Sequence, residues 1–202
     1  ISFPFLFHKP TLTYPFLLSK ILGPLYFPLL SILIFSFSFS LYTVYKVIYW
    51  LETLGLYSGL LEFFSETSLK LSLLFLLALF YFMLFSALKL IANTVNELAL
   101  FFFSKDQEGQ VLMKIRSGSI VFVVGSLFSL IFNQSLLMMT IIFLISCFVY
   151  FLFFLFKVSD FLTIGSMFGM VIMILLFWTA FVFLVSYIGL RIYNAILATL
   201  SI

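Results

Sequence analysis

The densest polar face in this apolar chain is formed by Lys89, Asn93, Asn96 and Glu97. Their spacing places Lys89, Asn93 and Glu97 on one side of a helix, with Asn96 beside them. An amine, two amides and a carboxylate in a row could form a polar path for ions or protons inside a membrane bundle. The row could instead bind a partner, or it could be a lysine that reaches the interface at a solvated helix end. We favour the solvated end, because about 20 residues of apolar helix precede Lys89.

No signature of catalysis or cofactor binding is found in the sequence. It contains no phosphate-binding loop, no HExxH, no GxSxG and no cysteine pair with metal-ligand spacing. His8 and Cys147 are the single histidine and the single cysteine, so neither has a like residue with which to share a metal. Asp106 and Asp160 fall in expected loops. We therefore predict that the protein is not an enzyme and binds neither a cofactor nor a metal.

The scarcity of charge identifies the medium in which the chain folds. Charged residues make up 8% and hydrophobic residues 65%, with a mean hydropathy of +1.32, whereas soluble proteins carry about 25% charged residues. Uncharged stretches cover residues 21–45, 71–88, 117–156 and 161–190. About 18 apolar residues suffice for a helix to cross the ~30 Å hydrocarbon core. The lipid bilayer is thus the first expected partner. Basic residues spread over every loop form no patch for nucleic acid.

We predict an all-α, polytopic membrane protein. The expected fold is a bundle of five transmembrane helices, with a short amphipathic interfacial helix between the first and the second. Residues 1–24 contain four prolines and are expected to be an irregular N-terminal arm, and residues 25–202 are expected to form a single transmembrane domain. The spans are expected at about 28–49, 69–91 with a continuation to 104, 118–132, 136–156 and 163–190.

Two of these boundaries rest on particular residues. Residues 117–156 would measure ~60 Å as one helix, twice the hydrocarbon thickness, so the chain must turn back. The polar triplet Asn133-Gln134-Ser135 is the expected turn. Between Leu51 and Glu66, apolar and polar residues fall on opposite sides of a helix, which predicts the interfacial segment.

The basic residues predict the orientation. Lys105, Lys114 and Arg116 make the loop at 104–118 the most basic one, so this loop is expected in the cytoplasm. Five spans then leave the N-terminus in the cytoplasm and the C-terminus outside.

Small residues mark candidate helix-packing faces. Gly165 and Gly169 have GxxxG spacing in an apolar context, which indicates either a dimer face or a contact within the chain. Ser36, Ser40 and Thr43 recur on one face of the first span, where they could form a close helix contact or a polar permeation face. Expected partners are therefore other membrane proteins or a second copy of the chain.

Five segments resemble the YufK-like proteins, small integral membrane proteins of Bacillus and its relatives. They are YFPLLSILIFSFSFSLYTVYK (26–46), LEFFSETSLKLSLLF (61–75), ALKLIANTVNELALFFFSKDQEG (87–109), FKVSD (156–160) and RIYNAI (191–196). The resemblance extends over residues 25–202. It implies a location in the bacterial plasma membrane and transfers no functional residue, because the family has no assigned activity.

Two functions agree with these observations. We predict a non-catalytic accessory or scaffold protein that acts through its helix faces. The alternative is a small transporter or channel, with a polar path at the cytoplasmic end of the second span.

Overall fold

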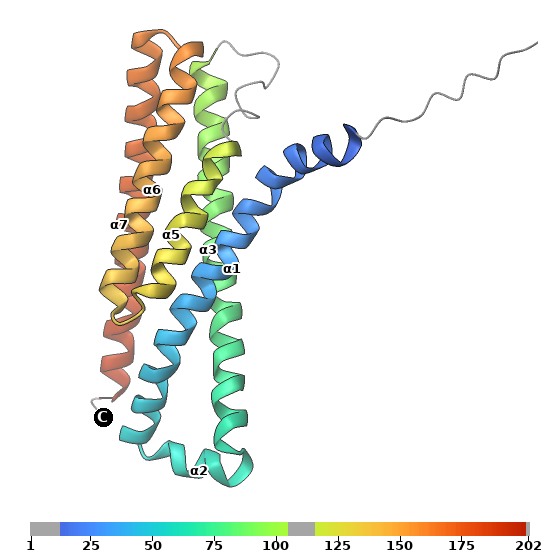
Figure 1. The fold of residues 1–202 in the computed structure, drawn as a ribbon. Helices are drawn as coiled ribbons and strands as arrows, with labels where there is room; N and C mark the ends of the chain where they lie inside the picture. The colour runs from blue at the N-terminus through green and yellow to red at the C-terminus, as the bar shows by residue number, and fades with distance from the viewer. Residues whose placement is uncertain (1–12, 105–115, 201–202) are drawn as a thin grey trace, which may run out of the picture. The chain divides into compact units, whose positions relative to one another are not determined.

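The computed structural model describes residues 13–104 and 116–200, which form helices and connecting turns without a strand (Figure 1). The all-α class is therefore confirmed. The elements are α1 (Thr13–Thr53), α2 (Leu56–Phe63), α3 (Glu66–Phe103), η1 (Arg116–Ser119), α5 (Ile120–Ile131), α6 (Leu136–Val158), η2 (Ser159–Phe161) and α7 (Ile164–Leu200).

Within residues 13–104 and 116–200, four segments are long and apolar enough to cross a membrane: Tyr26–Thr53, Glu66–Phe103, Leu136–Phe161 and Ile164–Thr199. The helix expected as the third span, α5, has only 12 residues. It is ~18 Å long and falls short of the ~30 Å hydrocarbon core. Its length is limited by the 3₁₀ turn η1 before it and by the turn at residues 132–135 after it.

Helix α1 begins earlier than the sequence indicated. Residues 13–24 are helical, in contrast to the irregular arm expected at 1–24, of which residues 1–12 lie outside the described part. Pro15 lies in the first turn, where the missing N–H leaves no hydrogen bond unmade. Pro24 and Pro28 lie further inside, and each removes one bond of the helix. Figure 1 shows α1 bending in its blue N-terminal part, as internal prolines cause.

The connection between α1 and α3 turns at Gly55, whose φ of 70° is left-handed. Only glycine adopts this conformation without a steric penalty, so the turn falls there. The eight-residue helix α2 follows, and none of its residues is buried. It occupies the place of the predicted amphipathic segment.

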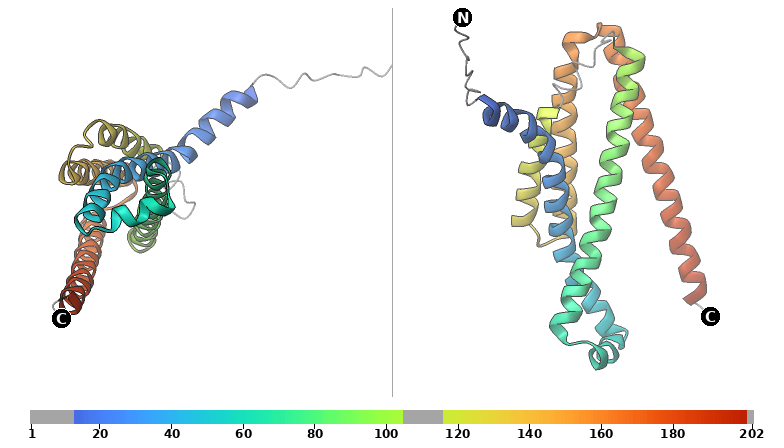
Figure 2. Two further views of the ribbon diagram at one scale, coloured as in Figure 1. Left: turned by 90° about the horizontal axis from the view of Figure 1, so that it is seen from below. Right: turned by 90° about the vertical axis from the view of Figure 1, so that its right-hand side faces the viewer.

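Contacts divide the chain into two compact units, and the single transmembrane domain expected over residues 25–202 stays a prediction. The first contains α1, α2, α3 up to Phe85, η1, α5 and α6 up to Phe153. The second contains the remainder of α3, the end of α6 and α7. In the first unit, α1 and α5 lie side by side (Figure 2), and α6 returns antiparallel to α5 after the turn at residues 132–135.

Each unit has its own buried residues. In the first, Phe35 of α1, Phe85 of α3 and Phe143 of α6 form an aromatic cluster with ring centroids 5.1 to 5.9 Å apart. Such edge-on and tilted pairs add to the energy of simple burial. In the second, the buried residues are Val95, Ala99, Leu100, Phe154, Val158, Met170 and Ile174.

Candidate functional site

Helices α1 and α5 are joined by two serines. The Ser38 hydroxyl donates a hydrogen bond of 2.8 Å to the Ser129 carbonyl, and the two hydroxyl oxygens lie 3.0 Å apart. Both side chains are fully buried. Neither residue was singled out in the sequence, although the alternation Ser36, Ser38, Ser40 indicates a small polar face wider than the one predicted. Because this bond joins residues of two helices, it fixes the register of α5 on α1.

The predicted packing residues of α1 lie near this contact. Ser36 and Ser40 are buried. The Ser36 hydroxyl donates to the Ile32 carbonyl at 2.6 Å, and the Ser40 hydroxyl donates to the Phe37 carbonyl at 2.8 Å, both within α1. The Thr43 hydroxyl donates to Phe39 at 2.8 Å and lies 2.9 Å from the Tyr81 hydroxyl of α3. These hydroxyls are therefore satisfied within the bundle.

A glycine brings α5 close to α6. A Cβ atom at Gly125 would overlap the Ser146 Oγ and would lie 3.0 Å from the Ser146 Cβ, a tighter approach than most Cβ atoms make. Ser146 itself donates to the Ile142 carbonyl at 2.8 Å. Small residues at such points allow two helix backbones to approach, which is how membrane helices pack.

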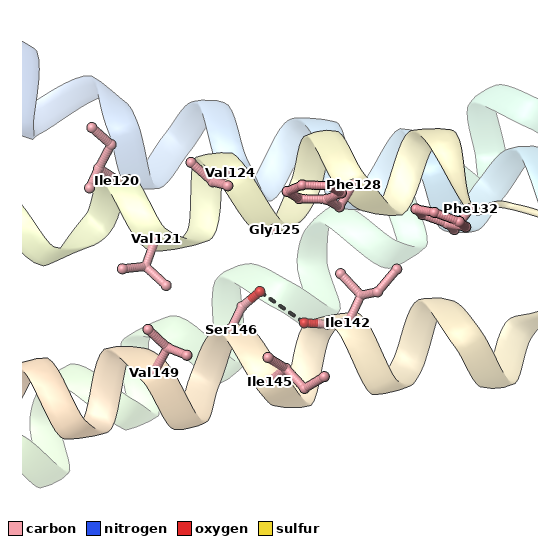
Figure 3. Close-up of a pocket in the computed structure, with 10 residues that line it drawn as sticks. All are labelled: Ile120, Val121, Val124, Gly125, Phe128, Phe132, Ile142, Ile145, Ser146 and Val149. Carbon is pink, nitrogen blue, oxygen red and sulfur yellow. Dashed lines mark hydrogen bonds between the residues drawn. The ribbon is translucent and has the colours of Figure 1, made fainter.

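Beside this close contact, α5 and α6 form an apolar groove of about 460 Å³ (Figure 3). The figure shows its two walls, one from each helix, with Ser146 between them and its hydrogen bond to Ile142. The lining residues are Ile120, Val121, Val124, Gly125, Phe128, Phe132, Ile142, Ile145, Ser146 and Val149. We name this feature the α5–α6 groove.

The predicted polar face of α3 is divided between two sides of the helix. Asn93 and Glu97 are exposed, whereas Lys89 and Asn96 are half-buried. Lys89 and Asn96 are seven residues apart and so lie on one stripe, which leads to the buried Leu100. The face therefore does not form one row that points in one direction.

The two glycines of α7 also differ. A Cβ atom at Gly169 would lie 2.5 Å from the Phe103 Cε1, whereas a Cβ atom at Gly165 would meet nothing within 4 Å. Gly169 thus allows the contact of α7 with the end of α3 within the second unit. Gly165 takes no part in that contact.

No group of three histidine, cysteine, aspartate or glutamate side chains that could hold a metal ion occurs among residues 13–104 and 116–200. Cys147 is half-buried on α6, and His8 lies outside the described residues. That the protein uses no metal or cofactor stays a prediction.

Long apolar helices joined by small residues and buried serine hydroxyls define an all-α integral membrane protein. The chain belongs to the family of unknown function DUF5366, which matches residues 43–201. It is 41% identical over 177 residues to "Uncharacterized membrane protein YufK" of Bacillus subtilis (strain 168), covering 88% of this chain and 96% of that protein. The resemblance to the YufK-like proteins is thus confirmed. No solved structure matches the chain.

Proposed function

We propose that this protein is a non-catalytic accessory or scaffold protein of the bacterial plasma membrane, which acts through its helix faces. The observation that carries the proposal is that the buried serine hydroxyls of α1 form hydrogen bonds with groups of the protein. Ser38 and Ser129 bond to one another, and Ser36 and Ser40 bond to carbonyls of their own helix. Hydroxyls bonded in this way stabilise helix contacts, whereas an ion path requires polar groups that face water.

The proposal includes α5 as a fifth span. The bonded serines Ser38 and Ser129 are 91 residues apart, and Phe35 lies beside Gly125, so α5 runs parallel to α1. The same offset places Asn133 at about the level of residue 42 of α1. Tyr42 and Lys46 lie there, with the Lys46 amine 6.0 Å from the centre of the Tyr42 ring. Aromatic and basic side chains of this kind mark the membrane interface, and a polar turn beside them supports a completed crossing.

The elements on either side of α5 in the sequence, η1 and α6, support α5 as a membrane span. Helix α6 begins after this turn, and its 23 residues measure ~34 Å. This length is sufficient to cross the ~30 Å hydrocarbon core, and Lys157 lies at the far end of the helix. The short α5 then requires local thinning of the bilayer, or residues of η1 that extend the crossing to ~26 Å. Either adjustment costs only fractions of a kcal/mol per ångström of mismatch.

The helix α2 is proposed to lie at the outer surface. Helix α1 continues from Thr43 to Thr53, ~15 Å past the level of the α5–α6 turn. The apolar side chains around α2 are exposed, among them Leu56 and Phe63 at 56% and 81%. A short helix with exposed apolar residues suits the headgroup region. The basic residues of the loop at 104–118 support a cytoplasmic N-terminus and an external C-terminus.

One observation favours a second function, that of a small transporter or channel. Lys89 is half-buried on α3 and follows directly after the uncharged residues 71–88. An ionisable residue within or at the end of a membrane span is costly when it is buried, and it marks a path for ions or protons in many membrane proteins. Asn96 lies on the same stripe.

Flux through proteoliposomes tests the two functions against each other. We expect the purified protein to conduct protons, Na⁺ and K⁺ no faster than protein-free vesicles, under gradients of either sign. The variants Lys89→Ala and Glu97→Ala remove the ionisable groups, and Thr94→Ala on the same helix is the matched control. A flux that Lys89→Ala abolishes and Thr94→Ala retains would overturn the scaffold and establish the transporter.

A further inference from the structure

We infer that the corner where α2 joins α1 to α3 binds a basic, amphipathic segment of another protein (Figure 1). We name residues 50–66 the α2 corner. Its large apolar side chains face the surroundings, since Trp50, Leu54 and Phe63 are 69%, 69% and 81% exposed. Exposed apolar patches mark interaction sites. The inference rests on the proposed scaffold function, for which it names a surface and a class of partner.

The charge of the α2 corner distinguishes it from a lipid-binding surface. Glu52, Glu62 and Glu66 are all exposed. Three carboxylates so close in sequence are too costly inside a bilayer, so the apolar residues among them are not covered by hydrocarbon. Helices that bind the membrane surface are rich in Lys and Arg, which attract anionic headgroups, whereas residues 50–66 contain no basic residue. The corner therefore matches the charge of a lipid surface poorly.

Two of these carboxylates are available to a basic partner. Glu66 is paired with Lys70, one turn further along α3. Neither Glu52 nor Glu62 forms an ion pair with any residue that the structure describes. A second copy would bring the same carboxylates face to face in a two-fold interface, where like charges repel. Charge complementarity thus favours a different protein that carries Lys or Arg.

The outward side of α2 has a shape that admits such a segment. Leu56, Gly59 and Phe63 recur at helical spacing, so one bulky side chain lies on either side of the glycine. A Cβ atom at Gly59 would meet nothing within 4 Å, so no contact inside the chain requires glycine there. Glycine destabilises a helix relative to alanine. The open notch at Gly59 is therefore suited to close approach by another chain, as small residues are between packed helices.

Binding of a synthetic helix to the full chain tests the inference. The protein is reconstituted in nanodiscs of phosphatidylcholine, which carries no net charge. The probe is a fluorescent peptide of Leu, Ala and Lys with every Lys on one side of the helix, and the control peptide has Glu in place of each Lys. In fluorescence anisotropy, we expect the Lys peptide to bind the protein several-fold more tightly than empty nanodiscs. The Glu peptide should bind the two alike.

Variants of the protein locate the binding surface. Glu52→Gln and Glu62→Gln should each weaken binding by up to about fivefold, the size of one exposed ion pair. Gly59→Leu should also weaken it, because the new side chain fills the notch. Asp160→Asn removes an exposed carboxylate elsewhere in the chain and should leave the affinity unchanged. Helical circular dichroism shows that each variant is folded.

Three results would overturn the inference. Equal binding of the Lys peptide to empty nanodiscs would mean that only lipid is involved, and equal binding to all variants would place the site elsewhere. A dimer of the protein that Gly59→Leu dissociates would show that a second copy occupies the corner. The proposed function is tested separately, because flux that depends on Lys89 overturns the scaffold whatever the peptide does. Absence of both flux and peptide binding overturns the α2 corner alone.

Discussion

Serine hydroxyls in this protein fall into two kinds, according to whether the hydrogen bond stays within a helix. Ser36, Ser40 and Ser146 bond to carbonyls three or four residues earlier, which satisfies them whatever helix lies beside them. Ser38 bonds to Ser129 across 91 residues of sequence, and Thr43 lies beside Tyr81. Only this second kind depends on the relative position of two helices, so it carries information about the fold.

We expect the Ser38–Ser129 pair to stabilise the bundle measurably. Replacing either residue by Ala removes the bond between the hydroxyls, and hydrogen bonds between membrane helices contribute about 0.6 kcal/mol on average and at most about 1.7 kcal/mol. A double-mutant cycle of Ser38→Ala and Ser129→Ala should therefore show a coupling energy of that size. The measurement is the loss of helical circular dichroism during titration with sodium dodecyl sulfate.

The matched control is Ser186→Ala, because Ser186 lies exposed on α7. It should leave the unfolding curve unchanged within ~0.5 kcal/mol. Additive effects of the two α1–α5 substitutions, with no coupling, would show that the contact does not hold in the protein.

At the scale of elements, the sequence allowed the helices to be predicted better than their contacts. The apolar runs and the polar triplet Asn133-Gln134-Ser135 locate α3, α6 and the turn before α6 to within a few residues. Periodicity within one segment could not reveal that α1 continues through Pro15 and Pro24, since proline penalties depend on position in the helix. Nor could it pair Ser38 with Ser129, because that bond exists only after two distant helices pack.

The GxxxG pair on α7 yields a prediction that separates its two interpretations. Gly169→Leu should destabilise the protein by about 1–3 kcal/mol, because the new side chain must displace the Phe103 ring. Gly165→Leu should be neutral or stabilising, since glycine costs up to about 1 kcal/mol in a helix and the position is open. Unfolding in sodium dodecyl sulfate measures both substitutions.

The oligomeric state of the same two variants completes the test. If Gly165 formed a dimer face, Gly165→Leu would shift the protein towards monomer in light scattering with detergent correction. Equal unfolding midpoints for the two variants would instead contradict the contact of Gly169 with Phe103.

At the scale of the whole molecule, the proposed five spans require neighbouring helices to share one placement in the bilayer. Helix α3 has 38 residues, ~57 Å, and its apolar sequence alone permits several depths in the bilayer. The bond of Thr43 with Tyr81 and the offset between Ser38 and Ser129 align α1, α3 and α5 with one another, so that residues 43 and 81 lie at about the level of the α5–α6 turn.

Accessibility of single cysteines tests this arrangement directly. In a Cys147→Ser background, a membrane-impermeant maleimide added to intact cells should label Gly59→Cys in α2 and Gln134→Cys in the α5–α6 turn, because both are proposed to lie outside. Ser159→Cys, in the short connection before α7, should react only after the cells are permeabilised. A Gln134→Cys that stays protected while Gly59→Cys reacts would show that α5 enters the membrane without crossing it. If α6 then crosses alone, the chain has four spans, Ser159→Cys lies outside and the C-terminus lies in the cytoplasm. If α6 does not cross either, the chain has three spans, Ser159→Cys lies inside and the C-terminus lies outside.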